Sequence, residues 1–234
     1  ASLRSATEDE VEAMRCLGDE AMAAGAVGFS TSTSPSHNGA DGNPMPSRLA
    51  TEHELKTLVG VLGTRGKGVF MLTKGSSTPV PFLETLAEEI KRPVVIAALL
   101  HNSTDPEGVF RDFECIEAAR SRNNLLWGQV SCCPLSNEFT LRAPYPFEGI
   151  AAWKPAMQAA SDEDYRQLLR DQSFRDSVRL ELTQPAAVRL FNGEWDKLKV
   201  LEVSRPSHQH LEGQSLASLA KSSGQDPLDL MLDL

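Results

Sequence analysis

The sequence lacks an excess of basic residues. Of its 234 residues, 23 are Lys or Arg and 32 are Asp or Glu, which gives a formal net charge of −9 at pH 7. Proteins that bind the phosphate backbone of DNA or RNA present a basic face to it. The charge balance therefore argues against a nucleic-acid partner.

Long hydrophobic runs and paired cysteine motifs are missing as well. No apolar run reaches the roughly 18 residues of a membrane-spanning helix, and no signal peptide is apparent, so we expect no membrane partner. The four cysteines include no CxxC motif, and Cys132 and Cys133 are adjacent, which is a poor geometry for a structural disulfide. We therefore expect a protein of the reducing cytoplasm.

What the chain has is a regular alternation of short apolar segments and amphipathic helices. Residues Thr7 with Glu10 and Thr51 with Glu54 match the capping box that opens a helix. Strands are predicted at residues 26–29, 69–72, 94–100 and 125–130, and helices at 7–24, 51–62, 81–92 and from 106 onward, with Gly25, Gly63 and Pro93 as stops. The continuously apolar run 94–100 is typical of a strand covered by helices on both faces.

Four such repeats predict parallel βαβ units and an α/β fold. An incomplete (β/α)8 (TIM) barrel is favoured because a complete one takes about 250 residues. A doubly wound open sheet stays as an alternative, since sequence does not give strand order. We expect residues 1–130 to form the βα repeats, and 131–234 to add an irregular loop, a charged helical stretch (162–182), a strand (198–203) and two short helices to the same domain. The absence of an initiator Met and a helical pattern at the last residues lead us to expect an internal fragment.

Polar side chains follow each predicted strand. They are Ser30, Thr31 and Ser32, then Thr73 and Lys74, then His101, Asn102 and Ser103, and finally Ser131, Cys132 and Cys133. Because the carboxyl ends of barrel strands meet on one face, we expect these groups to converge on a functional site. In the first loop, Arg48 is the preferred counter-charge for a substrate carboxylate, and His37 is interpreted as a surface or substrate-gating residue.

Each of these residues also has a plainer interpretation. The Ser/Thr run also matches an ordinary solvated turn, and Arg48 a surface ion pair. His101 also fits a helix cap, and the adjacent cysteines inert buried packing. The pair His208 and His210 mimics a zinc-binding spacing but is not followed by a further ligand.

Several segments of the chain carry a family resemblance in their order. They are GAVGFSTS (25–32), His37, DGNPMPS (41–47), ATEHEL (50–55), GVFML (68–72), RPVVIAALL (92–100) with Asp105-Pro106, GQV (128–130), EGQSLASLA (212–220) and GQDPLD (224–229). Together they resemble the N-acyl-D-amino-acid deacylase (D-aminoacylase) branch of the amidohydrolase superfamily. The resemblance covers most of the chain, and the order of the segments is more specific than any one of them.

The resemblance implies a (β/α)8 barrel that carries one or two zinc ions and hydrolyses the linear amide of an N-acyl-D-amino acid. Zinc polarises the carbonyl and lowers the pKa of a bound water, while an Asp on the last strand handles the proton. Only His101 lies where the family has a zinc ligand, and Thr73-Lys74 stands where an imidazole is expected. The family's His-x-His and Asp would lie outside residues 1–234. We therefore expect weak or no zinc binding, no catalytic residue and no turnover in this chain, with substrate contacts from Ser30, Thr31, Ser32, His37, Arg48, Thr73, Lys74 and Asn102.

Three function classes remain open from the sequence. The chain is a segment of a D-aminoacylase-like hydrolase, a non-catalytic or degenerate barrel homologue that binds small molecules, or an unrelated α/β domain with other hydrolytic or isomerase chemistry. A half barrel also leaves strand edges unpaired, such as that of residues 94–100. We therefore expect a homo-oligomer, with barrel elements completed between protomers.

Overall fold

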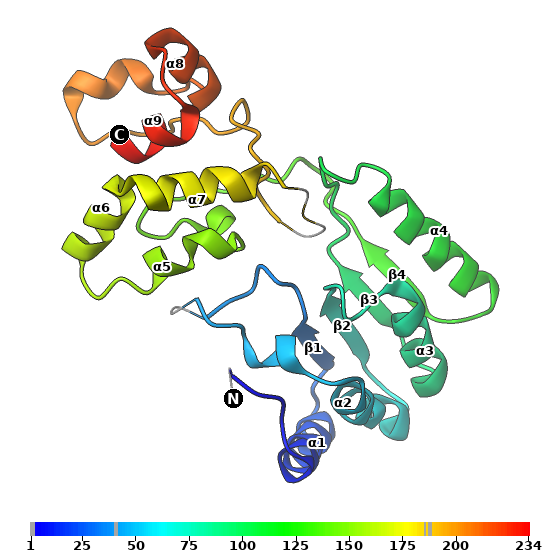
Figure 1. Ribbon diagram of the computed structural model, residues 1–234. Helices are drawn as coiled ribbons and strands as arrows, with labels where there is room; N and C mark the ends of the chain where they lie inside the picture. Colours follow the sequence, from blue (N-terminus) through cyan, green and yellow to red (C-terminus); the bar gives the residue numbers. More distant parts are fainter. Residues whose placement is uncertain (1–2, 40–41, 185, 187–188) are drawn as a thin grey trace. The chain divides into compact units, whose positions relative to one another are not determined.

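A computed structural model describes residues 3–39, 42–184, 186 and 189–234 (Figure 1). The chain divides into two compact units, Ala1–Leu135 and Ser136–Leu234. That the second unit belongs to the same domain as the first stays a prediction. In the described part of the chain, no helix is both long and apolar enough to cross a membrane.

The first unit alternates helices with parallel strands. In chain order they are α1 (Glu8–Ala23), β1 (Gly28–Ser32), the 3-10 helix η1 (Pro46–Leu49), α2 (Glu52–Arg65), β2 (Val69–Thr73), α3 (Val80–Ile90), β3 (Val94–Ala97), α4 (Gly108–Ser121) and β4 (Leu126–Gln129). The sheet order is β1-β2-β3-β4, and each neighbouring pair is parallel. Barrel strands follow one another in this way, whereas a doubly wound sheet reverses its order. The predicted partial barrel is confirmed, and the open-sheet alternative is wrong for these strands.

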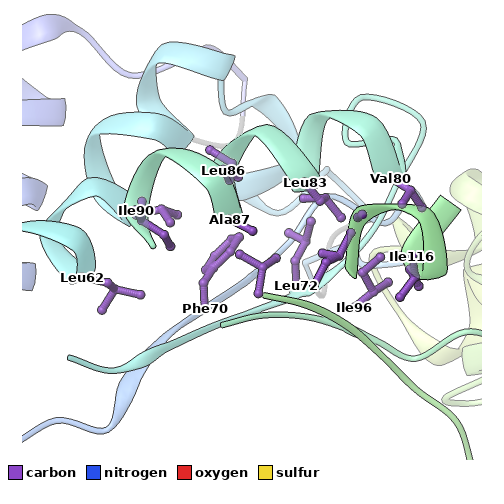
Figure 2. Close-up of a cluster of buried hydrophobic side chains, with 14 of the residues drawn as sticks. Leu62, Phe70, Leu72, Val80, Leu83, Leu86, Ala87, Ile90, Ile96 and Ile116 are labelled. Carbon is purple, nitrogen blue, oxygen red and sulfur yellow. The ribbon is translucent and has the colours of Figure 1, made fainter. Parts of the chain in front are cut away.

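The helices of the first unit pack against one face of the sheet. Phe70, Leu72 and Ile96 are fully buried beneath α3, whose side chains meet them in Figure 2. On the opposite face, Met71 and Trp127 are each 42% exposed. The prediction that helices cover both faces of the third strand is therefore wrong. In a barrel the second strand face lines the interior, so an apolar run does not need a second helix layer.

The strand boundaries differ from the predicted ones. β1 begins two residues later than expected and includes Ser30, Thr31 and Ser32, because these residues pair in register with β2. β3 ends at Ala97, three residues before the predicted end, and it pairs with both β2 and β4. The prediction that residues 94–100 form an unpaired edge is therefore wrong, and in the described sheet the edges are β1 and β4.

Local signals at helix ends were partly correct. The capping box of Thr7 and Glu10 is confirmed, because the backbone N of Glu10 donates to Thr7 Oγ1 and the backbone N of Thr7 donates to Glu10 Oε2. In α2, Thr51 caps Glu54 N, but the Glu54 side chain is buried, and burial raises its pKa. The predicted stop at Gly63 is wrong, because α2 runs to Arg65 and ends at Gly66 with φ 63°, where glycine is favoured.

The second unit is helical in its described part. Its elements are the 3-10 helices η2 (Tyr145–Phe147) and η3 (Ala151–Trp153), α5 (Lys154–Met157), α6 (Asp162–Arg170), α7 (Gln172–Leu182), the 3-10 helix η4 (Pro206–Leu211), α8 (Leu216–Ser223) and α9 (Pro227–Asp233). The predicted stretch 162–182 is broken at Asp171, whose side chain caps α7. The predicted strand 198–203 is wrong, since it makes only an isolated bridge between Lys199 and Ser215. The two short terminal helices are confirmed.

The core of the second unit is rich in aromatic rings. Phe147 and Trp153 are fully buried, and their ring centroids lie 5.1 Å apart. The ring of Phe174 lies 5.4 Å from that of Trp153, and the ring of Phe191 lies 5.0 Å from that of Phe147. Such large rings bury enough apolar area to hold short helices that would not be stable alone.

Candidate functional site

The loop that leaves β1 buries hydroxyl groups. Ser32, Thr33, Ser34 and Ser36 are each no more than 7% exposed. The interpretation of the run 30–34 as a solvated turn is therefore wrong for its last three residues, whereas Ser30 is exposed and Thr31 is half-buried. Thr33 Oγ1 lies 2.7 Å from Thr78 Oγ1 and accepts a hydrogen bond from the backbone N of Gly75 at 2.8 Å. This junction fixes the start of the loop to the segment after β2.

Most of the buried hydroxyls in this loop have internal partners. Ser32 Oγ accepts from Ser34 N at 3.2 Å, and Ser34 Oγ accepts from Ser36 N at 3.4 Å. Ser47 Oγ donates to the carbonyl of Ser32 at 2.7 Å. Ser36 Oγ is buried without a hydrogen-bond partner in the described structure. Such a group is costly unless another polar group meets it, so the loop has unused hydrogen-bonding capacity.

Arg48 and His37 are joined in the same loop. Both are half-buried, and Arg48 Nη1 donates to the His37 carbonyl at 3.3 Å and to Asn38 Oδ1. Burial lowers the pKa of Arg48, and burial followed by the positive charge of Arg48 lowers the pKa of His37. Among the residues that the structure describes, no carboxylate pairs with Arg48. Asp41 of the same loop lies outside the described residues, so the surface ion pair considered for Arg48 stays a prediction. Within the described structure, its Nε and Nη2 groups have no hydrogen-bond partner and can donate to an anion.

The three hydroxyls of β1 do not share one face. Thr31 pairs with Leu72, which lies beneath the helices, whereas Ser30 pairs with Met71 and Ser32 with Thr73. Because side chains alternate along a strand, Ser30 and Ser32 lie on the side of the sheet away from the helices and Thr31 on the helix side. The structure therefore brings Ser30, Ser32 and Thr73 together and separates Thr31 from them.

Lys74 and Asn102 already have partners at the strand ends. Lys74 Nζ lies 2.7 Å from Asp112 Oδ2 and so ties the end of β2 to α4. Asn102 Oδ1 accepts from both the backbone N and the hydroxyl of Thr104, each at 2.9 Å, which shapes the turn before α4. These contacts explain both side chains without a ligand.

The described residues do not fit a zinc site. His101 is exposed and lies four residues past the end of β3, not directly after it. Across residues 3–39, 42–184, 186 and 189–234, no group of three or more His, Cys, Asp or Glu side chains is placed to hold a metal. Zinc sites take three or four protein ligands. His101 alone therefore does not make a zinc site among the described residues.

Sequence reasoning missed several groups that shape the loop and the strand ends. Thr78 meets Thr33 from 45 positions away, and Asp112 reaches Lys74 from the fourth helix. No local pattern indicates either contact. The interpretation of the adjacent cysteines as buried packing is wrong, because Cys132 and Cys133 are both exposed free thiols.

Comparisons with known proteins give a likeness of fold. No protein-family model matches the sequence, and no curated protein matches it. Solved structures of D-aminoacylase do match, at 20% identity over 100% of this chain and 38% of theirs. The TM-score is 0.50 for the structure described as defining a novel subset of amidohydrolases, and 0.48 for one described by its binuclear metal centre. At this identity the likeness concerns the fold alone: the chain has part of the α/β barrel architecture found in the amidohydrolase D-aminoacylase.

Proposed function

We propose that this chain is a substrate-binding segment of a metal-dependent amidohydrolase that acts on N-acyl-D-amino acids. The observation that carries the proposal is the half-buried guanidinium of Arg48, which has no carboxylate partner in the described structure. The barrel fold shared with D-aminoacylase and the ordered sequence segments support the same assignment.

The chemistry of the loop suits the carboxylate of such a substrate. Nε and Nη2 of Arg48 form the fork that grips a carboxylate with two parallel hydrogen bonds. Partial burial strengthens that attraction, because the local dielectric is lower than in water. Ser36 Oγ adds an unused hydroxyl in the same loop. The lowered pKa of His37 favours the neutral ring at neutral pH, which suits a hydrogen bond to an uncharged amide.

Hydrolysis needs groups beyond the described ones. Lys74 is paired with Asp112, and His101 has no second metal ligand beside it in the described part of the chain. This chain also spans only 38% of the D-aminoacylase chains that it matches. We therefore propose that it binds the substrate without turning it over, and that zinc is bound weakly or not at all.

A second candidate is a small-molecule binding domain in a degenerate, non-catalytic barrel. The Lys74–Asp112 ion pair favours it, because Lys74 follows Thr73 at the strand end where the resemblance leads us to expect an imidazole ligand. The two candidates share the carboxylate site and differ in whether a complete parent protein hydrolyses the ligand.

Calorimetric titration tests the carboxylate site. The ligands are an N-acetyl-D-amino acid, its L enantiomer and the corresponding N-acetyl-D-amino amide, which lacks the carboxylate. We expect binding of the D acid, and a loss of about tenfold or more in Arg48→Met, since a hydrogen bond to a charged group contributes about 1.5–3 kcal/mol. Arg65→Met is the matched control, because that guanidinium pairs with Asp19 between α1 and α2.

Three outcomes would contradict the proposal. They are equal affinity for acid and amide, equal affinity for both enantiomers, and unchanged affinity in Arg48→Met.

Metal analysis and an amide-hydrolysis assay after incubation with zinc address catalysis separately. Stoichiometric zinc that is lost in His101→Ala, together with turnover, would show that the chain is an active enzyme. Zinc retained in that variant would point to His208 and His210.

A further inference from the structure

Two exposed thiols are consecutive in the sequence just past the end of β4. Cys132 and Cys133 follow β4, which ends at Gln129, and both are free and exposed. Cys16 and Cys115, the other free thiols, lie apart from them on α1 and α4. The structure places this pair in a loop, outside any helix or strand.

Ser131 closes a tight turn around the second cysteine. Its Oγ donates to the carbonyl of Cys133 at 2.6 Å and accepts from the backbone N of Cys133 at 3.4 Å. The same oxygen lies 3.9 Å from Cys133 Sγ. The turn restrains the backbone of the pair while it leaves both sulfur atoms at the surface.

A disulfide between adjacent cysteines is strained. Their Cα atoms are about 3.8 Å apart across a trans peptide, whereas disulfides usually join Cα atoms about 4.4–6.8 Å apart. Strained disulfides are more easily reduced, so the dithiol is the resting form in a reducing compartment. A ligand that inserts one atom between the two sulfurs relieves that strain.

We infer that Cys132 and Cys133 form a dithiol site that binds trivalent arsenicals through both sulfur atoms. An arylarsine oxide reacts by forming two As–S bonds while both S–H bonds and the As=O bond break. The oxygen leaves with the two protons as water, and arsenic stays trivalent, so no oxidant or reductant is needed. The inference is independent of the proposed hydrolase function, because it uses neither Arg48 nor a catalytic group.

Chelation distinguishes this pair from the two single thiols. Once one sulfur is bound, the second reacts within the same molecule at a high effective concentration, which raises affinity by about a hundredfold or more. Cys16 has no such neighbour, and its hydrogen bond with Glu12 raises its pKa, which disfavours the reactive thiolate. Single-thiol adducts at Cys16 or Cys115 are therefore expected to be displaced readily.

Phenylarsine oxide is the probe for this inference. Intact-mass measurement of the full chain is expected to show one bound phenylarsenic per molecule, which is removed by ethanedithiol but survives an equal concentration of a monothiol. Cys132→Ser and Cys133→Ser are each expected to weaken retention by about a hundredfold or more. Cys16→Ser and Cys115→Ser are the matched controls, and both are expected to retain the adduct as wild type does.

The inference fails if the adduct persists in the Cys132→Ser/Cys133→Ser double variant, or if a monothiol removes it from wild type as readily as the dithiol does. It also fails if Cys16→Ser or Cys115→Ser abolishes retention. Because both cysteines are exposed, all variants are expected to fold, and circular dichroism checks this. Carboxylate binding at Arg48 is measured in the same samples, so loss of the proposed substrate site is recognised separately.

Discussion

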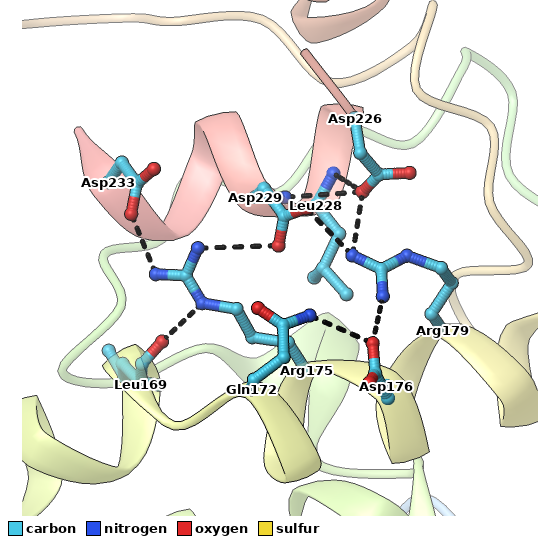
Figure 3. A network of polar contacts seen from close by, with 9 residues as sticks. All are labelled: Leu169, Gln172, Arg175, Asp176, Arg179, Asp226, Leu228, Asp229 and Asp233. Carbon is cyan, nitrogen blue, oxygen red and sulfur yellow. Dashed lines mark hydrogen bonds and ion pairs between the residues drawn. The ribbon is translucent and has the colours of Figure 1, made fainter.

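Replacing Arg175 by methionine is expected to destabilise the second unit by about 2–3 kcal/mol. The Arg175 side chain is only 8% exposed and joins the end of α6 to α9 (Figure 3). Its Nε donates to the Leu169 carbonyl at 2.7 Å, Nη2 to Asp233 Oδ1 at 2.7 Å and Nη1 to Asp229 Oδ1 at 3.3 Å. Methionine keeps much of the buried volume but removes all three hydrogen bonds.

The magnitude follows from how exposed the partners are. Removing one member of a buried ion pair costs about 3–5 kcal/mol when the remaining charge is left buried without a partner. Here the side chain of Asp233 is 50% exposed and that of Asp229 is 28% exposed, so water takes over part of the lost interaction. Burial alone lowers the pKa of Arg175, but Asp233 and then Asp229 outweigh it and raise that pKa. The charged form is therefore the one that the fold stabilises.

Urea unfolding measures the effect, with fluorescence of Trp153 and Trp195 reporting on the second unit. A loss of 2 kcal/mol in a unit of this size lowers Tm by about 10 °C. Arg166→Met is the matched control on α6, because its ion pair with Glu163 spans 4.0 Å between exposed side chains and contributes less than about 1 kcal/mol. Arg175→Lys should fall between wild type and Arg175→Met, since lysine keeps the charge but not the planar fork. An Arg175→Met protein within about 0.5 kcal/mol of wild type would refute the reasoning.

Three further predictions concern other parts of the chain. Thr33→Val should destabilise the first unit by about 1–3 kcal/mol in urea unfolding, because Gly75 N and the Thr78 hydroxyl lose a buried partner, while Thr33→Ser should cost less. Burial raises the pKa of Tyr165 to about 12, so the neutral phenol should stabilise the fold fully below pH 10 and lose that contribution as the pH rises to about 12. Comparing the tyrosinate absorbance of wild type and Tyr165→Phe across this pH range tests this. Self-association through the edge strands β1 and β4 is expected, because Trp127 of β4 is exposed and so is Val27, which directly precedes β1; a stable monomer in light scattering at micromolar concentration would contradict it.

The sequence by itself determined the kinds of element in the first unit and their alternation. Apolar spacing at helical periods and the capping signal at Thr7 act over a few residues, so they can be recognised without the fold. The parallel βαβ arrangement followed from those repeats, and with it the face on which the strands end. The Ser/Thr run and Arg48 were likewise visible as polar groups after the first strand.

Only the tertiary structure decided what these residues contact. The order of the strands makes β3 a central strand, and pairing with β2 extends β1 through Ser32, which sets Thr31 on the opposite face from Ser30. Partners distant in sequence bury Thr33 against Thr78 and Arg175 between two helices of the second unit. Local sequence specifies backbone preference and periodicity, whereas burial, ion pairing and strand edges arise when segments far apart in the chain meet.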